Sequence, residues 1–168
     1  DGLELSTSAE DGIVVWDRLW RVGAGLGIAA VGAAALEAHR IEKAVPRPGV
    51  DWRPAHLARD AGDLRLPVDL GHAPDLTRRF NGADALRRTV AQGRQVLVHL
   101  SSPEPLSMGP LMARAVVGRV TSAAWSEAQA AAFALAWLDA DAVKPGTKLT
   151  PTGAATPRAE ILRPVFGT

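Results

Sequence analysis

The side chains that could do chemistry are few and widely spaced in this sequence of 168 residues. Cysteine is absent, which excludes disulfides, thiolate metal sites and a cysteine nucleophile. Tyrosine is absent too, so a common general acid and ligand-stacking ring is missing. The four histidines, at positions 39, 56, 72 and 99, share no metal-ligand spacing, and a structural or surface role fits each of them better. The sequence therefore assigns no catalytic residue and no metal site.

General functional motifs do not add an activity. The sequence has no glycine-rich phosphate loop before a helix, no GxSxG elbow and no HExxH. Gly23, Gly25 and Gly27 form a GxGxG at a predicted helix end and not after a strand, so they do not indicate dinucleotide binding. The 19 basic and 18 acidic side chains give a net charge of +1, which argues against a partner that is nucleic acid or an anionic membrane. No segment approaches the roughly 20 apolar residues that span a bilayer, and we expect a cytoplasmic location.

Hydrophobic spacing predicts the elements that must position any site. Helices are predicted from Ser8 as N-cap to Gly23 or Gly25, over 33–44 and over 82–92, and strands over 2–7, 95–100, 115–122, 131–138, 145–149 (a turn entering a strand) and 159–166. Residues 45–80, which are rich in proline, glycine and aspartate, have little regular pattern. The sequence is thus mixed α and β before residues 80–94 and all β after them, and the short strands indicate a small barrel or sandwich.

The first predicted helix has an apolar stripe, in which Ile13, Trp16, Leu19 and Trp20 recur at helical spacing. We predict that this stripe belongs to a core. The chain opens directly on a strand-like alternation, so we also expect that an N-terminal part of a longer polypeptide is missing here. Another segment or chain would then cover the apolar surface left open.

Six short segments together resemble a known family. They are Gly2-Leu3-Glu4-Leu5, Val15-Trp16-Asp17-Arg18-Leu19, the run from Val31 to Lys43, Gly49-Val50-Asp51, Val117-Gly118-Arg119-Val120-Thr121-Ser122 and Lys144-Pro145-Gly146-Thr147-Lys148-Leu149. In this order they resemble the aminomethyltransferases, that is, the glycine-cleavage T-protein and the folate domains of sarcosine and dimethylglycine oxidoreductases. The run from Leu36 to Lys43 is nearer the oxidoreductase-linked branch. The resemblance covers the C-terminal half or so of a family member.

The resemblance implies both a fold and a function. Residues 1–80 would be the C-terminal part of an α+β folate-binding domain, and residues 81–168 a small antiparallel β-barrel domain. Relatives hand a one-carbon unit from a methylated amine or a similar donor to tetrahydrofolate, so the implied cofactor is tetrahydrofolate. The implied activity is that of an aminomethyl- or methyltransferase of one-carbon metabolism.

The same resemblance implies the site residues. Glu4 stands where the family places a carboxylate that accepts two hydrogen bonds from the pterin edge. Trp52 lies near the implied domain junction, as a ligand-lining or simply a packing residue, and Phe166 offers a ring near the C-terminus. Arg40 and Glu42 would brace the folate domain against its neighbours.

Three departures leave alternatives open. Leu36 stands where relatives of the T-protein carry a folate-contacting arginine, the family's tyrosines are missing, and the family's catalytic aspartate lies in the N-terminal half. The chain could therefore be the C-terminal part of the transferase, a non-catalytic folate-binding-like subunit or scaffold of a larger oxidoreductase or transferase, or a degenerate member that uses another small ligand. An acidic residue in the family's catalytic context upstream of Asp1 would favour the enzyme.

Overall fold

The computed structural model describes residues 2–57, 59, 75–90, 95–151, 153–156 and 158–166. The chain divides into two compact units, Asp1–Ala33 and Ala34–Thr168. Residues 58 and 60–74 of the predicted irregular stretch, which include His72, and residues 91–92 at the end of the third predicted helix lie outside the described residues. The predicted division into residues 1–80 and 81–168 stays a prediction.

The first unit contains one helix, α1 (Gly12–Gly23), followed by a short 3-10 helix, η1 (Ala24–Leu26). The prediction of Ser8 as its N-cap was wrong, because Asp11 occupies that position. Ser8 is engaged elsewhere: its hydroxyl donates to the Asp11 carboxylate at 2.7 Å across the turn that precedes the helix. The helix is followed by Gly27, whose φ of 74° fits the left-handed conformation typical of a glycine stop.

Two predictions for this unit were wrong. Residues 2–7 are not a strand, since no neighbouring strand pairs with them in the described part of the chain, and an isolated strand is not stable in water. The apolar stripe of α1 is not buried, because Ile13 is 76% and Trp16 58% exposed. Trp16 meets Trp20 edge to face, with ring centroids 5.7 Å apart. The stripe is therefore an exposed apolar face of this unit.

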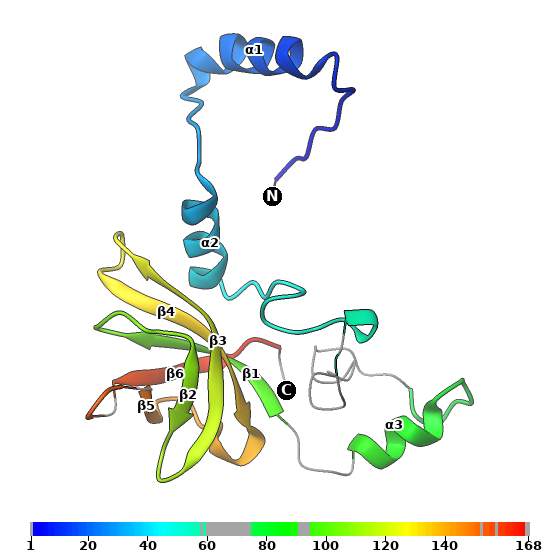
Figure 1. Cartoon of the computed structure of the whole chain (residues 1–168), viewed down its shortest axis with the longest axis vertical. Coiled ribbons are helices and arrows are strands. Elements are labelled where there is room, and N and C mark those ends of the chain that lie inside the picture. Colours follow the sequence, from blue (N-terminus) through cyan, green and yellow to red (C-terminus); the bar gives the residue numbers. More distant parts are fainter. Residues whose placement is uncertain are drawn as a thin grey trace. The chain divides into compact units, whose positions relative to one another are not determined.

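In its described residues, the second unit begins with helices and continues with six strands. Its elements are α2 (Ala33–Glu42), η2 (Ala55–Leu57), α3 (Ala83–Val90), β1 (Gln95–Ser102), β2 (Gly109–Met112), β3 (Val116–Ser126), β4 (Ala131–Asp139), η5 (Ala140–Ala142), β5 (Lys148–Pro151) and β6 (Ala159–Pro164). The strands pair antiparallel in the order β1-β4-β3-β2-β5-β6, and β6 pairs with β1, so the sheet closes into a barrel (Figure 1). The mixed α and β class and the antiparallel sheet are as predicted.

The barrel has an apolar interior built by alternation along each strand. From β1 and β4, Val98 and Leu100 meet Ala134, Ala136 and Leu138 inside. The intervening Leu97, Leu135 and Trp137 form a second buried cluster with Ala44. Residues 131–138 are apolar on both faces of the strand, because the segment that follows α2 covers the outer face of β4.

Helix α2 is fixed to the strand β3 by polar contacts. The Arg40 guanidinium donates to Ser122 Oγ at 2.8 Å, and Ser126 Oγ donates to the Glu42 carboxylate at 3.0 Å. Both serines belong to β3, and Arg40 and Glu42 both belong to α2, so the two contacts join the same helix to the same strand. Figure 1 shows α2 beside the end of the barrel where β3 and β4 meet. These contacts join α2 to the barrel, and the implied bracing of a folate domain against its neighbours stays a prediction.

Candidate functional site

The loop after α2 places one carboxylate against the barrel. Pro46, Pro48 and Gly49 prevent the helix from continuing, and Gly49 takes a φ of 81° that favours glycine. The Gly49 N–H donates to the Trp52 carbonyl at 2.7 Å and closes a tight turn around Asp51. The Asp51 side chain has no exposed surface, so its charge must be satisfied by protein groups.

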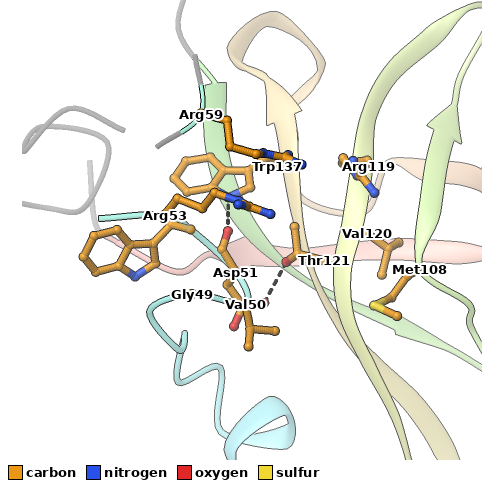
Figure 2. Close-up of a pocket in the computed structure, with 11 residues that line it drawn as sticks. Gly49, Val50, Asp51, Arg53, Arg59, Met108, Arg119, Val120, Thr121 and Trp137 are labelled. Carbon is orange, nitrogen blue, oxygen red and sulfur yellow. Dashed lines mark hydrogen bonds between the residues drawn. The ribbon is translucent and has the colours of Figure 1, made fainter. Parts of the chain in front are cut away.

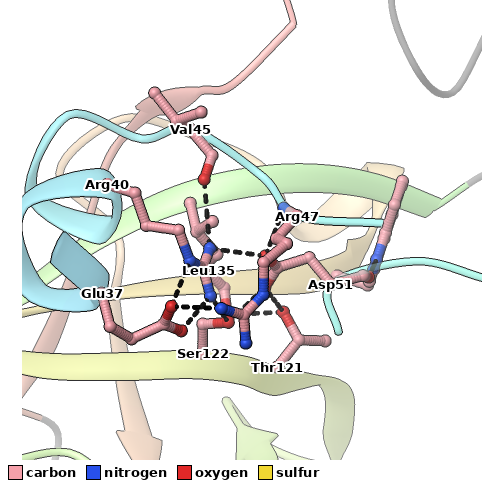
Figure 3. Close-up of polar contacts among 9 residues, drawn as sticks. Glu37, Arg40, Val45, Arg47, Asp51, Thr121, Ser122 and Leu135 are labelled. Carbon is pink, nitrogen blue, oxygen red and sulfur yellow. Dashed lines mark hydrogen bonds and ion pairs between the residues drawn. The ribbon is translucent and has the colours of Figure 1, made fainter. Parts of the chain in front are cut away.

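Asp51 accepts four hydrogen bonds (Figure 3). Thr121 Oγ1 donates at 2.7 Å and Ser122 Oγ at 2.5 Å to one carboxylate oxygen. The Arg40 guanidinium and the Arg47 backbone N–H each donate at 2.8 Å to the other. Both oxygens of the buried carboxylate are therefore occupied, as a buried charge requires. We call Asp51, Arg40, Thr121 and Ser122 the Asp51 hub.

Arg40 extends the hub back to its own helix. Its guanidinium forms a bidentate ion pair with Glu37, and it also donates to the Val45 carbonyl at 3.1 Å. Arg47 pairs with the same Glu37 at 2.8 Å. The hydrogen bond from Arg40 lowers the pKa of Glu37, and the same bond raises the pKa of Arg40. Both groups stay charged, and the arginine bridges helix, loop and barrel.

The hub also orients aromatic side chains on the outer face of the barrel. Trp137 Nε1 donates to the Asp51 carbonyl at 2.6 Å, which fixes the indole. Trp52 and Phe166 pack against the cluster of Ala44, Leu97, Leu135 and Trp137. Two of the three residues predicted to contact a cofactor thus lie at one cluster, where they have a packing role. The third, Glu4, is exposed in the first unit.

A pocket of about 330 Å³ opens beside the hub (Figure 2). Its lining combines two indoles, Trp52 and Trp137, with three arginines, Arg53, Arg59 and Arg119. Asp51 is the carboxylate among the lining residues, and its oxygens are used within the hub. Trp137 is 2% exposed, so Trp52, which is half-buried, supplies most of the aromatic surface that faces the pocket.

Sequence reasoning named Trp52 for this region but missed the arginines and Trp137. Arg53 and Arg59 lie in the segment with no regular pattern, where side-chain direction cannot be deduced. Arg119 belongs to the Val117–Ser122 segment, which was recognised only as a family element. The available signal was the adjacency of Arg119 to Thr121 and Ser122 on one predicted strand.

His99 is a buried titratable group on the same outer face. It is 5% exposed, stacks on Phe133 with centroids 5.4 Å apart, and its Nε2 has no hydrogen-bond partner within the described part of the chain. Burial lowers the pKa of His99, the charge of Arg163 lowers it further, and a hydrogen bond with the Ile41 backbone acts in the opposite direction. The neutral imidazole is therefore the form that the fold accommodates.

This environment predicts a loss of stability in mild acid. The unfolded chain takes up the proton near pH 6.5, whereas the folded chain does so only at lower pH, so the free energy of unfolding falls as the pH drops below about 6.5. The slope from this one group is at most about 1.4 kcal/mol per pH unit. Urea unfolding at pH 7.5 and 5.5 should show a smaller pH dependence for His99→Gln than for the unmodified chain. An equal pH dependence for the two would contradict the assignment.

Within the described residues, the structure shows neither a metal-binding cluster nor a helix that could span a membrane. In the part of the chain that the structure describes, no group of three or more histidine, aspartate or glutamate side chains could hold a metal ion. No helix among the same residues is both long and apolar enough to cross a bilayer.

These features define a small antiparallel β-barrel domain with a helix fixed to its outer face. Residues 89–166 match the family model described as the glycine cleavage T-protein C-terminal barrel domain. The match identifies the barrel, residues 89–166, as a domain of this kind, and the chain as a whole is similar to aminomethyltransferases.

Relatives extend the match over nearly the whole chain. A 4-methylaminobutanoate oxidase (formaldehyde-forming) from Paenarthrobacter nicotinovorans is 33% identical over 147 residues, which is 84% of this chain and 17% of the oxidase. An aminomethyltransferase from a Synechococcus species is 28% identical over 181 residues, covering 99% of this chain and 45% of that protein. The chain therefore spans less than half the length of these relatives.

A solved structure has the same fold. The glycine cleavage system aminomethyltransferase T from Bartonella henselae superposes with a TM-score of 0.70 at 19% identity, over 92% of this chain and 43% of that one.

Proposed function

We propose that this chain is the C-terminal part of a tetrahydrofolate-dependent one-carbon transferase that acts in the cytoplasm. The observation that carries the proposal is the match of the barrel to the T-protein C-terminal domain, joined to relatives that continue the match through the preceding helices. Within such an enzyme this chain would hold the folate and exclude water, so that a reactive one-carbon species is captured before hydrolysis. Proton transfer would fall to residues outside these 168.

Three residues are proposed as folate contacts. Glu4 is exposed and unpaired within the described residues, so its carboxylate is available to accept two hydrogen bonds from the pterin edge. Trp52 lines the pocket beside the hub and offers an aromatic face. Phe166 packs against the same cluster of Ala44 and Trp137.

A second candidate function is that of a non-catalytic scaffold in a larger oxidoreductase or transferase. The observation that favours it is Leu36, which is 59% exposed on α2 at the position where the resemblance implies a folate-contacting arginine. A leucine makes no charge-assisted hydrogen bond, and the loss of one lowers affinity unless another group replaces it.

Both candidates share a proposal about partners. The apolar face of α1 and Leu5, which is 64% exposed, would be covered by another chain or by a further segment of the same polypeptide. The one-carbon donor would be a methylated amine or a similar small molecule.

Calorimetric titration of tetrahydrofolate into the full polypeptide that carries this chain tests the transferase. We expect micromolar binding, a free energy of about −8 kcal/mol. Glu4→Gln should weaken it about ten- to a hundredfold, because the bidentate ionic hydrogen bonds are lost. Glu10→Gln, at another exposed glutamate of the same unit, should leave it unchanged. An absence of binding by the unmodified polypeptide would contradict the transferase and favour the scaffold.

A further inference from the structure

Asparagine occurs once in this chain, at position 81, and the residue that follows it is Gly82. Both residues are exposed, in the turn that leads into α3. The Ala83 N–H donates to the Phe80 carbonyl at 3.1 Å and closes this turn. Gly82 takes a φ of 88°, a left-handed conformation that residues with a side chain rarely adopt. The turn thus requires a glycine directly after the asparagine.

The two groups of this turn that can react with each other are both free. Within the described part of the chain, neither the Asn81 side-chain amide nor the Gly82 backbone N–H has a hydrogen-bond partner. Nothing lies within 4 Å of the place where a Cβ of Gly82 would be, so the space around this backbone nitrogen is open. Two groups held next to each other in one chain react as an intramolecular pair, without the entropic cost of an encounter.

We propose that Asn81-Gly82 is a site of spontaneous deamidation. The Gly82 nitrogen, after losing its proton to hydroxide, attacks the carbonyl carbon of the Asn81 side chain. The new N–C bond closes a cyclic imide, and the side-chain nitrogen takes up a proton from water and leaves as ammonia.

Water then opens the imide at one of its two carbonyl carbons. Opening at the side-chain carbonyl carbon leaves an aspartate. Opening at the backbone carbonyl carbon leaves an isoaspartate, in which the main chain runs through the former side chain. In total, asparagine and water give aspartate or isoaspartate and ammonia, and the reaction needs no oxidant or reductant.

The two products differ in what they do to α3. Arg87 on α3 donates to the Leu76 carbonyl at 2.6 Å and to the Arg78 carbonyl at 3.2 Å, so the segment before the turn is held against the helix. An aspartate at position 81 adds a negative charge just before α3, where the helix dipole favours one. An isoaspartate lengthens the main chain between Phe80 and Ala83 by a methylene group, so the turn and the Arg87 contacts cannot both keep their geometry. Isoaspartate formation therefore loosens the start of α3.

Ageing of the full polypeptide that carries this chain tests the proposal. Trypsin cleaves after Arg79 and Arg87 and releases the peptide Phe80–Arg87, whose mass rises when the side-chain NH₂ is replaced by OH. At 37 °C we expect the heavier peptide to accumulate over days, and at least about tenfold faster at pH 8 than at pH 6, because the deprotonated fraction of a very weak acid rises about tenfold per pH unit. It should elute as two components, one of which coincides with the peptide from Asn81→Asp.

The same ageing in urea gives the outcome that would overturn the proposal. If the peptide Phe80–Arg87 from the folded protein keeps its mass while the same peptide from the unfolded protein becomes heavier, the turn protects Asn81 and the site is not reactive. The inference concerns this turn alone and holds whether or not the polypeptide binds tetrahydrofolate.

Two variants at position 81 separate the chemistry from its consequence. Asn81→Gln keeps a side-chain amide but must close a larger ring, so its peptide should keep its mass under the same conditions. A mass increase at the unmodified rate in this variant would contradict the mechanism. Asn81→Asp adds the charge without lengthening the main chain, so amide hydrogen exchange over α3 should be faster in the aged protein than in this variant. Equal exchange in the two would contradict the loosening of α3.

Discussion

Asp51→Ala should lower the free energy of unfolding by about 3–5 kcal/mol, the usual effect of removing one partner from a buried ion pair. The substitution takes away the acceptor for four hydrogen bonds at once. It leaves the Thr121 and Ser122 hydroxyls and the Arg47 backbone N–H without their present acceptor in a site closed to water. Arg40 keeps its pair with Glu37, which limits the loss toward the lower end of this range. Urea unfolding of the chain measures the effect.

The position of the hub predicts which part of the chain Asp51→Ala destabilises most. Because Asp51 and Arg40 hold α2 and its loop against β3, amide hydrogen exchange in Asp51→Ala should accelerate more over Ala33–Glu42 than over β4. Asp141→Ala is the control, since Asp141 is an exposed carboxylate in η5, and it should change the free energy of unfolding by less than about 0.5 kcal/mol. A loss below about 1 kcal/mol for Asp51→Ala would mean that the hub does not stabilise the fold.

The sequence predicted elements better than it predicted what joins them. Helix α2 and strands β1, β3 and β4 follow from spacing of apolar residues, because each buries a regular face. Residues 2–7 carry the same alternation, yet they form no strand. Alternation indicates which side of a segment is apolar, but it does not indicate whether another strand is there to pair with it. Strand β2 was missed because four residues that include Pro110 carry too little pattern.

The candidate site was predicted only in part, for a related reason. Asp51 and Thr121 are 70 positions apart in sequence, and only the closed barrel brings β3 against the loop after α2. The Gly-Arg-Val-Thr-Ser segment was recognised as a family element. Its physical role is that two hydroxyls, of Thr121 and Ser122, donate to the buried Asp51 carboxylate, and this contact is visible only in the structure. The arginines of the pocket meet at a loop whose direction no periodicity specifies.

Gly118→Ala should be among the most damaging single changes in the barrel. A Cβ atom at this position would lie 2.0 Å from the Trp137 carbonyl oxygen and 2.9 Å from the Leu138 Cα atom, both backbone atoms of the paired strand β4. Backbone cannot rotate away as a flexible side chain does, so β3 and β4 would have to separate where Gly118 pairs with Leu138. We expect a loss on the order of 4 kcal/mol or more, beyond ordinary overpacking of a core.

The close approach of β3 and β4 at Gly118 also affects the pocket. The next pair in the register is Arg119 and Trp137, and both residues line the pocket. Partial separation of the strands would displace these two residues together and change the shape of the pocket in any folded fraction. Gly25→Ala is the matched control: nothing lies within 4 Å of its added Cβ, and the thermal midpoint should not fall. If Gly118→Ala unfolded at the same temperature as Gly25→Ala, the predicted clash between β3 and β4 would be contradicted.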